Sequence, residues 1–247
     1  MPGKWTTPPT GHVESWLANR MHPARIAKTC PPVTARPETR VLDRNGVLAS
    51  LGERACVELE LGCGSSKRNA GAIGVDALDL PGVDLVGDVH DVLGALPVAS
   101  VDRVASFHFF EHIDDLPGLL NALARVVKPG GEIHVVAPHF SNPYYYSDYT
   151  HRRPFGLYTF AYLARSRLFA REVPLYGITP LFELVDVKLG FKSTRPFYVR
   201  HAAKRAIGVV ANLGRWTQEC WEENLCWLFP CYEIAYTLRR IEVDATI

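Results

Sequence analysis

The sequence predicts an α/β fold, a doubly wound and mostly parallel sheet with helices on both faces. Short apolar runs of strand length alternate with segments of helical periodicity, which is the pattern of βαβ units. Polar residues follow several of these runs at the point where each strand would end, and parallel sheets bind their ligands at that edge. The length of 247 residues and the hydrophobic content of 47% are sufficient for one large domain with its own core.

The apolar pattern places the elements along the chain. Seven strands are expected, over residues 55–61, 72–75, 83–86, 101–107, 132–137, 182–189 and 232–243. A helix is expected between the fourth and fifth strands, because apolar residues share one helical face at Leu116, Leu119, Leu120, Leu123, Val126 and Val127. Asp114 or Asp115 can cap this helix, and Pro117 suits its first turn. The sequence KPGG at 128–131 is expected to end it.

Composition and charge exclude several classes of function. The 27 basic and 26 acidic residues give a net charge of +1 without a basic stripe, so no nucleic-acid partner is expected. The six cysteines form no Cys-x-x-Cys pair and no usual zinc spacing, so we expect reduced thiols in a cytoplasmic protein. The first residues lack the apolar core of a secretory signal, and no apolar run is long enough for a membrane-spanning helix.

The stretch VELELGCGSS at 57–66 indicates a site for a small molecule. A buried strand ends there in Glu60, and Gly62 and Gly64 allow a sharp turn and the close approach of a ligand. A dinucleotide-binding loop would need a third glycine where the chain has Lys67, and the connection to the next strand is too short for a full helix. A cationic adenosine compound without phosphates therefore fits better than NAD.

Four strand ends carry a polar residue, at Glu60, Asp76, Asp88 and Ser106. One such acid alone is more often a solvated loop carboxylate or a helix cap. Recurrence at the same edge of a sheet is better explained by a single ligand. Asp76 would accept hydrogen bonds from both ribose hydroxyls, and Asp88 would accept one from the adenine amino group, with the Val89 N–H nearby.

Six stretches of the chain together resemble class I S-adenosylmethionine-dependent methyltransferases. They are ELGCGSS at 60–66, IGVD at 73–76, VGDVHD at 86–91, LPVASVDRVASFHFFEHI at 96–113, LARVVKPGGEIHVVAP at 123–138 and HFSNPYYYSDYTHRRPFGLYTFAYL at 139–163. The short first connection is similar to a subgroup with a trimmed first helix, which includes enzymes of saccharide and cell-envelope loci. The resemblance implies a Rossmann-like, seven-stranded sheet with an antiparallel last strand and added C-terminal helices, and S-adenosylmethionine as the cofactor.

The resemblance also implies roles for the residues that match its motifs. The methionine end of the cofactor would be held by Glu60, Gly62, Cys63 and Gly64. The ribose would be bound by Asp76, and the sulfonium side would be lined by Ser106 and Phe107. The adenine would be flanked by Asp88 and Val89, with Asp91 as a competing candidate.

Methyl transfer is an in-line displacement on a methyl group that the cofactor has already activated, so the protein mainly aligns the acceptor. An alcohol acceptor also loses a proton, for which a histidine or a carboxylate is suited. The candidates are His108, Glu111, His112, His139, Asp148 and His151. We expect His139 or His151 to be the base. No carboxylate cluster for a metal ion is evident, and no metal is predicted.

The segment after the fifth strand is denser in aromatic and polar side chains than any other. Aromatic faces stack on sugar rings and polar groups bind hydroxyls, so a saccharide acceptor would be bound by Tyr144, Tyr145, Tyr146, Asp148 and Arg152. The alternative is a tyrosine-rich lid that only covers the cofactor. The predicted function is O-methylation of a saccharide or glycoconjugate hydroxyl. Alternatives are a small-molecule methyltransferase of secondary metabolism and a non-catalytic, cofactor-binding partner subunit.

The chain is expected to divide into an N-terminal extension over 1–50 and a methyltransferase domain over 51–247. Within the domain, 139–181 would form a lid insertion over the acceptor and 192–231 a helical excursion before the last strand. The excursion is amphipathic with a basic side, so an extra helix pair that covers the acceptor site or forms a homodimer is expected there. Peripheral contact of 200–229 with a membrane surface is the second hypothesis.

Overall fold

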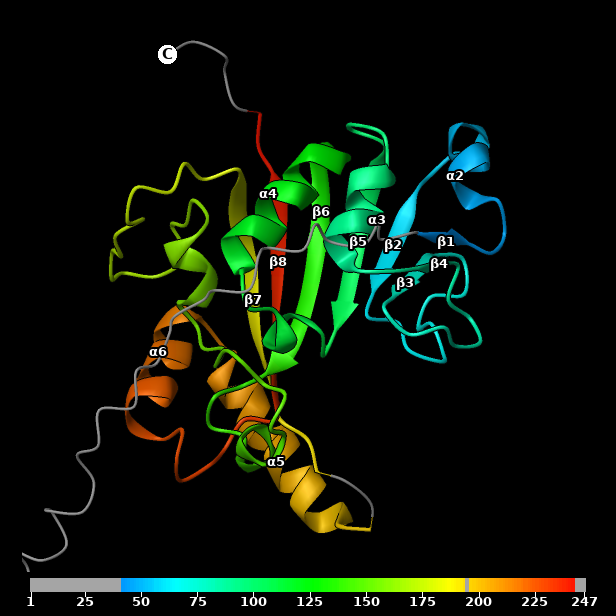
Figure 1. Cartoon of the computed structure of the whole chain (residues 1–247). Helices are drawn as coiled ribbons and strands as arrows, with labels where there is room; N and C mark the ends of the chain where they lie inside the picture. The colour runs from blue at the N-terminus through cyan, green and yellow to red at the C-terminus, as the bar shows by residue number, and fades with distance from the viewer. Residues whose placement is uncertain (1–40, 194–195, 243–247) are drawn as a thin grey trace, which may run out of the picture. The chain divides into compact units, whose positions relative to one another are not determined.

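The computed structural model describes residues 41–193 and 196–242, so most of the expected N-terminal extension lies outside the described residues. A mixed sheet runs through the described domain in the order β1-β4-β3-β2-β5-β6-β8-β7 (Figure 1). Its strands are β1 (Leu42–Asp43), β2 (Glu58–Leu61), β3 (Ile73–Asp76), β4 (Leu85–Val86), β5 (Val101–Phe107), β6 (Val127–Pro138), β7 (Phe182–Gly190) and β8 (Glu233–Arg240). The five neighbouring strands β4, β3, β2, β5 and β6 are parallel, and β8 is antiparallel to both β6 and β7. The predicted sheet with its antiparallel last strand is therefore confirmed.

The structure adds one strand to the seven that were predicted. β1 pairs antiparallel with β4 at the edge of the sheet, with Leu42 opposite Val86. The carboxylate of Asp43 then accepts the backbone N–H groups of Val47 and Leu48 at the start of the short helix α2 (Val47–Ser50). Two residues carry no periodicity, so only their pairing with β4 identifies this strand.

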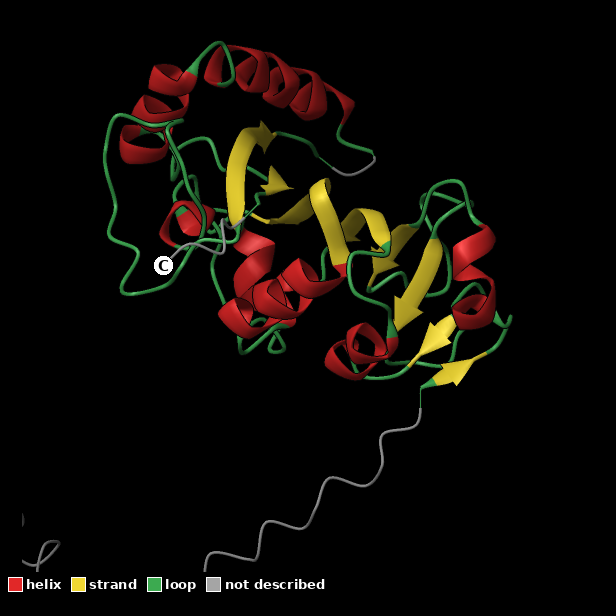
Figure 2. Ribbon diagram, turned by 90° about the horizontal axis from the view of Figure 1, so that it is seen from above, coloured by secondary structure: helices red, strands yellow, loops and turns green. Residues whose placement is uncertain are grey.

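Helices cover both faces of the sheet. α3 (Val89–Ala95) and α4 (Leu116–Val126) lie against one face, and α5 (Tyr198–Ala211) and α6 (Arg215–Asn224) lie on the opposite side near β7 (Figure 2). In α4 the predicted apolar face is buried, and Asp115 caps the helix by accepting the Gly118 N–H. The 3₁₀ turns of the described residues are η1 (Leu51–Glu53), η2 (Phe110–His112), η3 (Pro143–Ser147) and η4 (Thr159–Tyr162).

The helix ends before KPGG, as expected, but the segment itself lies inside a strand rather than in a loop between helix and strand. β6 begins at Val127, directly after α4, and residues 128–131 are part of it. The pairing of β6 with β5 shifts register between Val101 and Arg103, and Gly130 has a φ of 79°. The glycines therefore form a bulge within the strand. They suggested a loop because a bulge needs the same backbone freedom as a loop.

The connection from β2 to β3 contains no helix over residues 62–72, as its short length predicted. Parallel strands are usually joined through a helix that packs on the sheet. Here polar contacts hold the connection instead, because the buried Glu60 carboxylate accepts the backbone N–H groups of Arg68 and Asn69. The Arg68 guanidinium lies 4.0 Å above the ring of Phe107 and ties the loop to the end of β5.

Lys67 and Asp84 form a largely buried ion pair that also supports this connection. Nζ of Lys67 lies 2.7 Å from Oδ2 of Asp84 and donates to the Ala72 carbonyl as well. The Asp84 carboxylate also accepts the Gly74 N–H and the Asn45 amide. Burial by itself would raise the pKa of Asp84, but these hydrogen bonds outweigh it and hold the pKa below its ordinary value of 3.8.

We expect the free energy of unfolding to fall more steeply in acid for the wild type than for Asp84→Asn. A carboxyl with a depressed folded-state pKa stabilises the fold above its unfolded-state pKa, and that contribution is lost as the pH falls through the folded-state pKa. At neutral pH, the free energy of unfolding of Asp84→Asn should be lower than that of the wild type by about 3 kcal/mol, because the Lys67 ammonium is left without its partner. Urea unfolding across the acid range measures both effects, and Asp79→Asn, at a half-exposed carboxyl, is the control. Equal pH slopes in wild type and Asp84→Asn would contradict the expectation.

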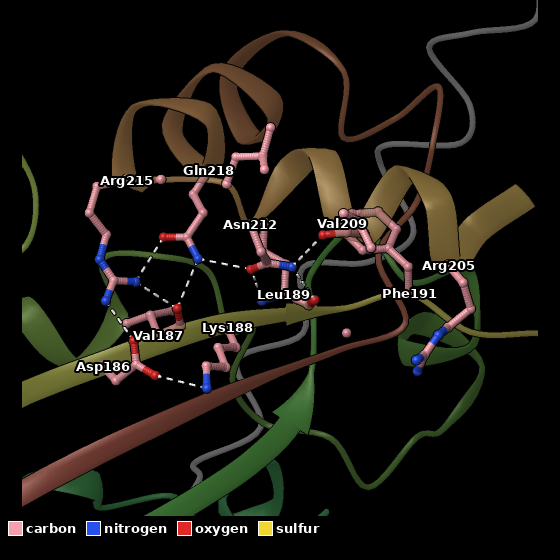
Figure 3. A pocket seen from close by; sticks show the side chains of 14 residues that line it. Asp186, Val187, Lys188, Leu189, Phe191, Arg205, Val209, Asn212, Arg215 and Gln218 are labelled. Atoms are coloured by element: carbon pink, nitrogen blue, oxygen red, sulfur yellow. Dashed lines mark hydrogen bonds and ion pairs between the residues drawn. The ribbon is translucent and has the colours of Figure 1, made fainter.

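The excursion over 192–231 contains α5 and α6 and is anchored to the outer edge of β7 (Figure 3). The Arg215 guanidinium and the Gln218 amide both donate to the Val187 carbonyl. The Asn212 side chain pairs with the N–H and the carbonyl of Leu189. These groups line a cavity of about 570 Å³. Since they are already paired with one another, the cavity is a packing feature at the sheet's last strand, apart from the ends of the central strands.

The helix pair also presents large apolar side chains to solvent. The exposed residues on and after α5 and α6 are Val209, Val210, Leu213, Trp216, Trp227 and Leu228. Among the described residues, no helix is both long and apolar enough to cross a membrane. The homodimer and the membrane-surface contact stay predictions.

Candidate active site

The carboxyl ends of three central strands meet at one edge of the sheet (Figure 1). Leu61 in β2 pairs with Val75 in β3 on one side and with Ser106 in β5 on the other. The same edge is therefore lined by the residues that come next, Gly62, Asp76 and Phe107. This is the edge at which parallel sheets bind their ligands.

Both glycines of the turn after β2 have left-handed backbone, with φ of 65° at Gly62 and 58° at Gly64. A β-carbon at Gly62 would lie 2.7 Å from Cβ of Phe109, so any other residue there would displace the chain. At Gly64 no atom lies within 4 Å of such a β-carbon, and the need for glycine is conformational. The turn therefore leaves bare backbone beside the strand ends.

Asp76, at the end of β3, is held in place by the same turn. Its Oδ2 accepts the Gly64 N–H and its Oδ1 accepts the Leu78 N–H, each at 2.9 Å. Each carboxylate oxygen has a further lone pair, so this fixed side chain can still accept hydrogen bonds from two hydroxyls. The geometry suits the predicted ribose contact.

Glu60 is 2% exposed, and both of its carboxylate oxygens already accept backbone N–H groups of the connection after β2. The sequence predicted that Glu60 holds the methionine end of the cofactor. Its observed contacts favour a positioning role, in which Glu60 holds the loop that carries Gly62 and Gly64. Cys63, between the two glycines, is buried, and burial raises the pKa of its thiol to about 11, so it packs as a neutral group.

Asp88 caps α3, because its carboxylate accepts the His90 N–H at 2.9 Å. Val89 is buried as the first residue of that helix, and Asp91 lies in its first turn. A helix cap is the alternative that sequence reasoning left open for a lone acid. The exposed Asp88 carboxylate keeps further lone pairs, so its contact with adenine, and the choice between Asp88 and Asp91, stay predictions.

Ser106 is fully buried, and its Oγ has no hydrogen-bond partner among the described residues. Buried hydroxyls are nearly always paired, so this Oγ is an exception, but it has no exposed surface for a ligand, and the predicted contact of Ser106 with the cofactor stays a prediction. The neighbouring strand ends carry the bare glycine backbone, the fixed Asp76 carboxylate and the Phe107 ring. This combination fits a phosphate-free adenosine compound.

His108 bridges two carboxylates directly beyond β5. Its Nδ1 lies 3.5 Å from Oε1 of Glu111, and its Nε2 lies 3.3 Å from Oε2 of Glu233. The neighbouring carboxylates, Glu111 first and then Glu233, raise the pKa of His108 to about 9, so the ring is charged at neutral pH. A charged imidazole has no free lone pair for a proton, which argues against His108 as the base.

His139 follows β6 and is fully buried. Its Nε2 lies 3.0 Å from Oε2 of Glu222 in α6, and its Nδ1 accepts the Ser141 N–H at 3.1 Å. Glu222 also accepts the N–H of Leu157 in the predicted lid. With both nitrogens engaged and no exposed surface, His139 is better suited to tying the lid to α6 than to meeting an acceptor.

His151 belongs to the predicted lid and packs against other side chains of that segment and of η2. Its Nδ1 is 2.8 Å from the Tyr145 carbonyl, and its ring stacks on Tyr145 with centroids 5.0 Å apart. The ring of His112 is also 5.0 Å away, and the Asp148 carboxylate is 3.6 Å from Nε2 of His151. Of the two predicted bases, His151 is the one with a partly exposed side chain.

The three consecutive tyrosines have different environments. Tyr144 and Tyr146 are 59% and 62% exposed, whereas Tyr145 is buried beneath His151. The half-exposed Arg152 side chain lies 3.6 Å from Asp114, while its backbone N–H donates to the Glu111 carbonyl. A stacking surface for an acceptor would therefore come from Tyr144 and Tyr146.

Sequence reasoning did not single out Arg68, Glu222 and Glu233. Glu233 begins the last strand, and its antiparallel register places it at the same edge as the ends of the parallel strands. The antiparallel direction of this strand was predicted, so the strand pattern carried a signal for Glu233. Arg68 and Glu222 contact their partners through the packing of a loop and a helix, which no local sequence pattern predicts.

Residues 59–135, just under a third of the chain, match the model of a methyltransferase domain family. The match extends from β2 into β6 and includes the strand ends described above. No curated protein matches the chain.

Several solved structures match the chain at low identity. They include a SAM-dependent methyltransferase from Archaeoglobus fulgidus, with 22% identity and a TM-score of 0.46 over 78% of this chain and 93% of that one. A putative sarcosine dimethylglycine methyltransferase from Galdieria sulphuraria has 16% identity and a TM-score of 0.47 over 78% of this chain and 82% of that one. Phosphoethanolamine N-methyltransferase 2 from Haemonchus contortus, in complex with S-adenosyl-L-methionine, has 14% identity and a TM-score of 0.42 over 79% and 52%.

Residues 59–135 carry a methyltransferase domain, and the sheet around them has a Rossmann-like order. The two findings together support an S-adenosylmethionine-dependent methyltransferase. Its cofactor is S-adenosylmethionine.

Proposed function

We propose that the protein transfers the methyl group to a hydroxyl of a saccharide or glycoconjugate. The observation that supports this acceptor is the combination, on one lid segment, of the exposed Tyr144 and Tyr146 with the polar group around His151. Aromatic faces can stack on a sugar ring while the polar side chains meet its hydroxyls. The cofactor residues inferred above would hold the methyl donor at the adjoining strand ends.

In this proposal the protein acts mainly by alignment. The cofactor supplies a methyl group on a positively charged sulfur. Gly62, Gly64 and Asp76 fix the cofactor along the ends of β2 and β3, and Ser106 adjoins its reacting end. Tyr144 and Tyr146 hold the acceptor, whose hydroxyl is turned toward His151. Glu222 and His139 keep the lid against α6, so they act on the reaction only through the position of the lid.

The acceptor class is tested by incubating the full chain and S-adenosylmethionine with a panel of saccharides, amines and phenols. Formation of S-adenosylhomocysteine together with a methyl ether on a sugar, identified by mass spectrometry and NMR, is the expected result. Tyr144→Ala and Tyr146→Ala should raise the KM for the sugar by about fivefold each, since loss of one aromatic contact costs about 1 kcal/mol. Tyr198→Ala, an exposed tyrosine on α5, is the matched control. Methylation of amines or phenols only, or tyrosine variants that behave like the control, would exclude the saccharide proposal.

A further inference from the structure

Three potential metal ligands converge beyond the end of β5. One ligand atom from each of Glu111, His112 and His151 lies within 4.8 Å of the other two. Glu111 and His112 belong to η2, four and five residues after Phe107, and His151 comes from the lid. The group was not foreseen from the sequence, because its third member is brought in by a segment that follows another strand.

The carboxylate of Glu111 has unused capacity to bind a cation. The residue is 1% exposed, and neither of its carboxylate oxygens has a hydrogen-bond partner among the described residues. The nearest charged group among the described residues is the ring of His108. Its Nδ1 lies 3.5 Å from Oε1 of Glu111, which is too far for a good hydrogen bond. Buried carboxylates are costly unless they are fully paired or bind a metal.

The hydrogen bonds of His112 leave one of its nitrogens free. Thr150 Oγ1 lies 2.6 Å from Oδ1 of Asp148, and a carboxylate can only accept, so the single hydroxyl proton of Thr150 is donated there. The Thr150 oxygen, 3.0 Å from Nδ1 of His112, must therefore accept the Nδ1 proton. Nε2 of His112 is left with its lone pair.

The hydrogen bonds of His151 also leave the lone pair of its Nε2 free. Its Nδ1 lies 2.8 Å from the Tyr145 carbonyl, which can only accept, so the proton resides on Nδ1. Nε2 is 3.6 Å from the Asp148 carboxylate, too far for a hydrogen bond, and keeps its lone pair. An imidazole that donates one N–H to a backbone carbonyl or to a polar network and presents the other nitrogen is the usual arrangement at metal sites.

We propose that Glu111, His112 and His151 bind one divalent transition-metal ion of the zinc type. Two imidazole nitrogens and one carboxylate are a ligand set of catalytic zinc and non-haem iron sites, which keep coordination positions open for a substrate. This inference deepens the proposed function and rests on it, because the open position would take the acceptor hydroxyl. The role of His151 is then that of a metal ligand rather than of a free base.

The ion would replace a protein base in the methyl transfer. Coordination lowers the pKa of a hydroxyl, whose proton then leaves to water. The electron pair of the acceptor oxygen forms the new O–CH₃ bond, the S–CH₃ bond breaks, and its electron pair stays on sulfur. The products are the methyl ether and S-adenosylhomocysteine, and no oxidant or reductant is needed.

The test is titration of the full chain, after dialysis against EDTA, with Zn²⁺ by calorimetry and with Co²⁺ by visible absorption. One ion per chain is expected, with a Co²⁺ spectrum typical of nitrogen and oxygen ligands. Glu111→Gln and His151→Gln should each weaken binding at least about tenfold. His90→Gln, at an exposed histidine on α3, should bind like the wild type. Circular dichroism and S-adenosylhomocysteine binding show whether each variant is folded.

The outcomes separate this proposal from the proposed function. No binding by the wild type, or unchanged binding in both folded variants, would overturn the metal site. A sulfur-to-cobalt charge-transfer band would overturn it too, because it would assign the ion to a cysteine such as the exposed Cys56. Saccharide methylation that persists in EDTA would leave the proposed function standing without the metal. Metal binding lost in the variants, with no methylation of any saccharide, would leave the metal site standing and remove the acceptor class.

Discussion

Asp76→Ala is expected to bind S-adenosylhomocysteine roughly 100-fold more weakly than the wild type. The variant loses two hydrogen bonds from ribose hydroxyls to a carboxylate, at about 1.5 kcal/mol or more each, and every 1.4 kcal/mol is a factor of ten in Kd. It also releases the Gly64 and Leu78 N–H groups that Asp76 holds. Calorimetric titration with S-adenosylmethionine and S-adenosylhomocysteine measures the effect, and NAD, titrated alongside, should give no heat.

Two further variants separate contact with the cofactor from support of the turn. Asp79→Ala removes a half-exposed carboxyl three residues farther on and should bind like the wild type. Asp76→Asn keeps an acceptor oxygen for the turn but lacks the charge, so its affinity should lie between those of the wild type and Asp76→Ala. Affinity of Asp76→Ala equal to that of the wild type, in a folded protein, would remove Asp76 from the cofactor site.

Gly62→Ala is expected to be the most destabilising single change at the site, by about 3 kcal/mol. An alanine at a φ of 65° costs roughly 1–2 kcal/mol, and its β-carbon would overlap the side chain of Phe109, which adds roughly 1–3 kcal/mol. The displaced turn would also move the Gly64 N–H away from Asp76. The affinity for S-adenosylhomocysteine should therefore fall together with the free energy of unfolding. Urea unfolding at neutral pH gives the free energy directly.

Gly64→Ala is the matched control, because it carries the same backbone strain with no atom in the way of the new β-carbon. Its free energy of unfolding should fall by only about 1 kcal/mol. In Gly62→Ala/Phe109→Ala the overlap is gone, so the double variant should be less destabilised than the sum of its two single changes. Equal losses for Gly62→Ala and Gly64→Ala would show that the contact with Phe109 does not matter.

The cofactor half of the site was predictable because its residues are adjacent in sequence to strand ends. A short apolar run predicts a strand, and the parallel order of the strands brings Gly62, Asp76 and Ser106 to one edge. What could not be predicted is how the carboxylates are used. Glu60 and Asp88 hold a loop and a helix, and these contacts depend on where the backbone N–H groups of Arg68 and His90 lie.

The proposed acceptor half was predictable in composition but not in arrangement. The lid was predicted from its tyrosines and histidines, yet His139 is buried against α6 while His151 lies beside Tyr145 and His112. The sequence spacing of the two histidines contains no information on this difference. It arises because Glu222, from a helix far along the chain, accepts a hydrogen bond from one of them and the Tyr145 carbonyl accepts one from the other.

The sequence by itself determined the fold class, the positions of seven strands, the missing first helix and the edge of the sheet at which we expect the cofactor. Each of these follows from local periodicity, from glycine positions and from the length of a connection, all of which act between near neighbours. Only the tertiary structure decided the added strand β1, the bulge in β6 and the convergence of Glu111, His112 and His151. Those features depend on contacts between segments far apart in the chain, and the packing that makes them has no period in the sequence.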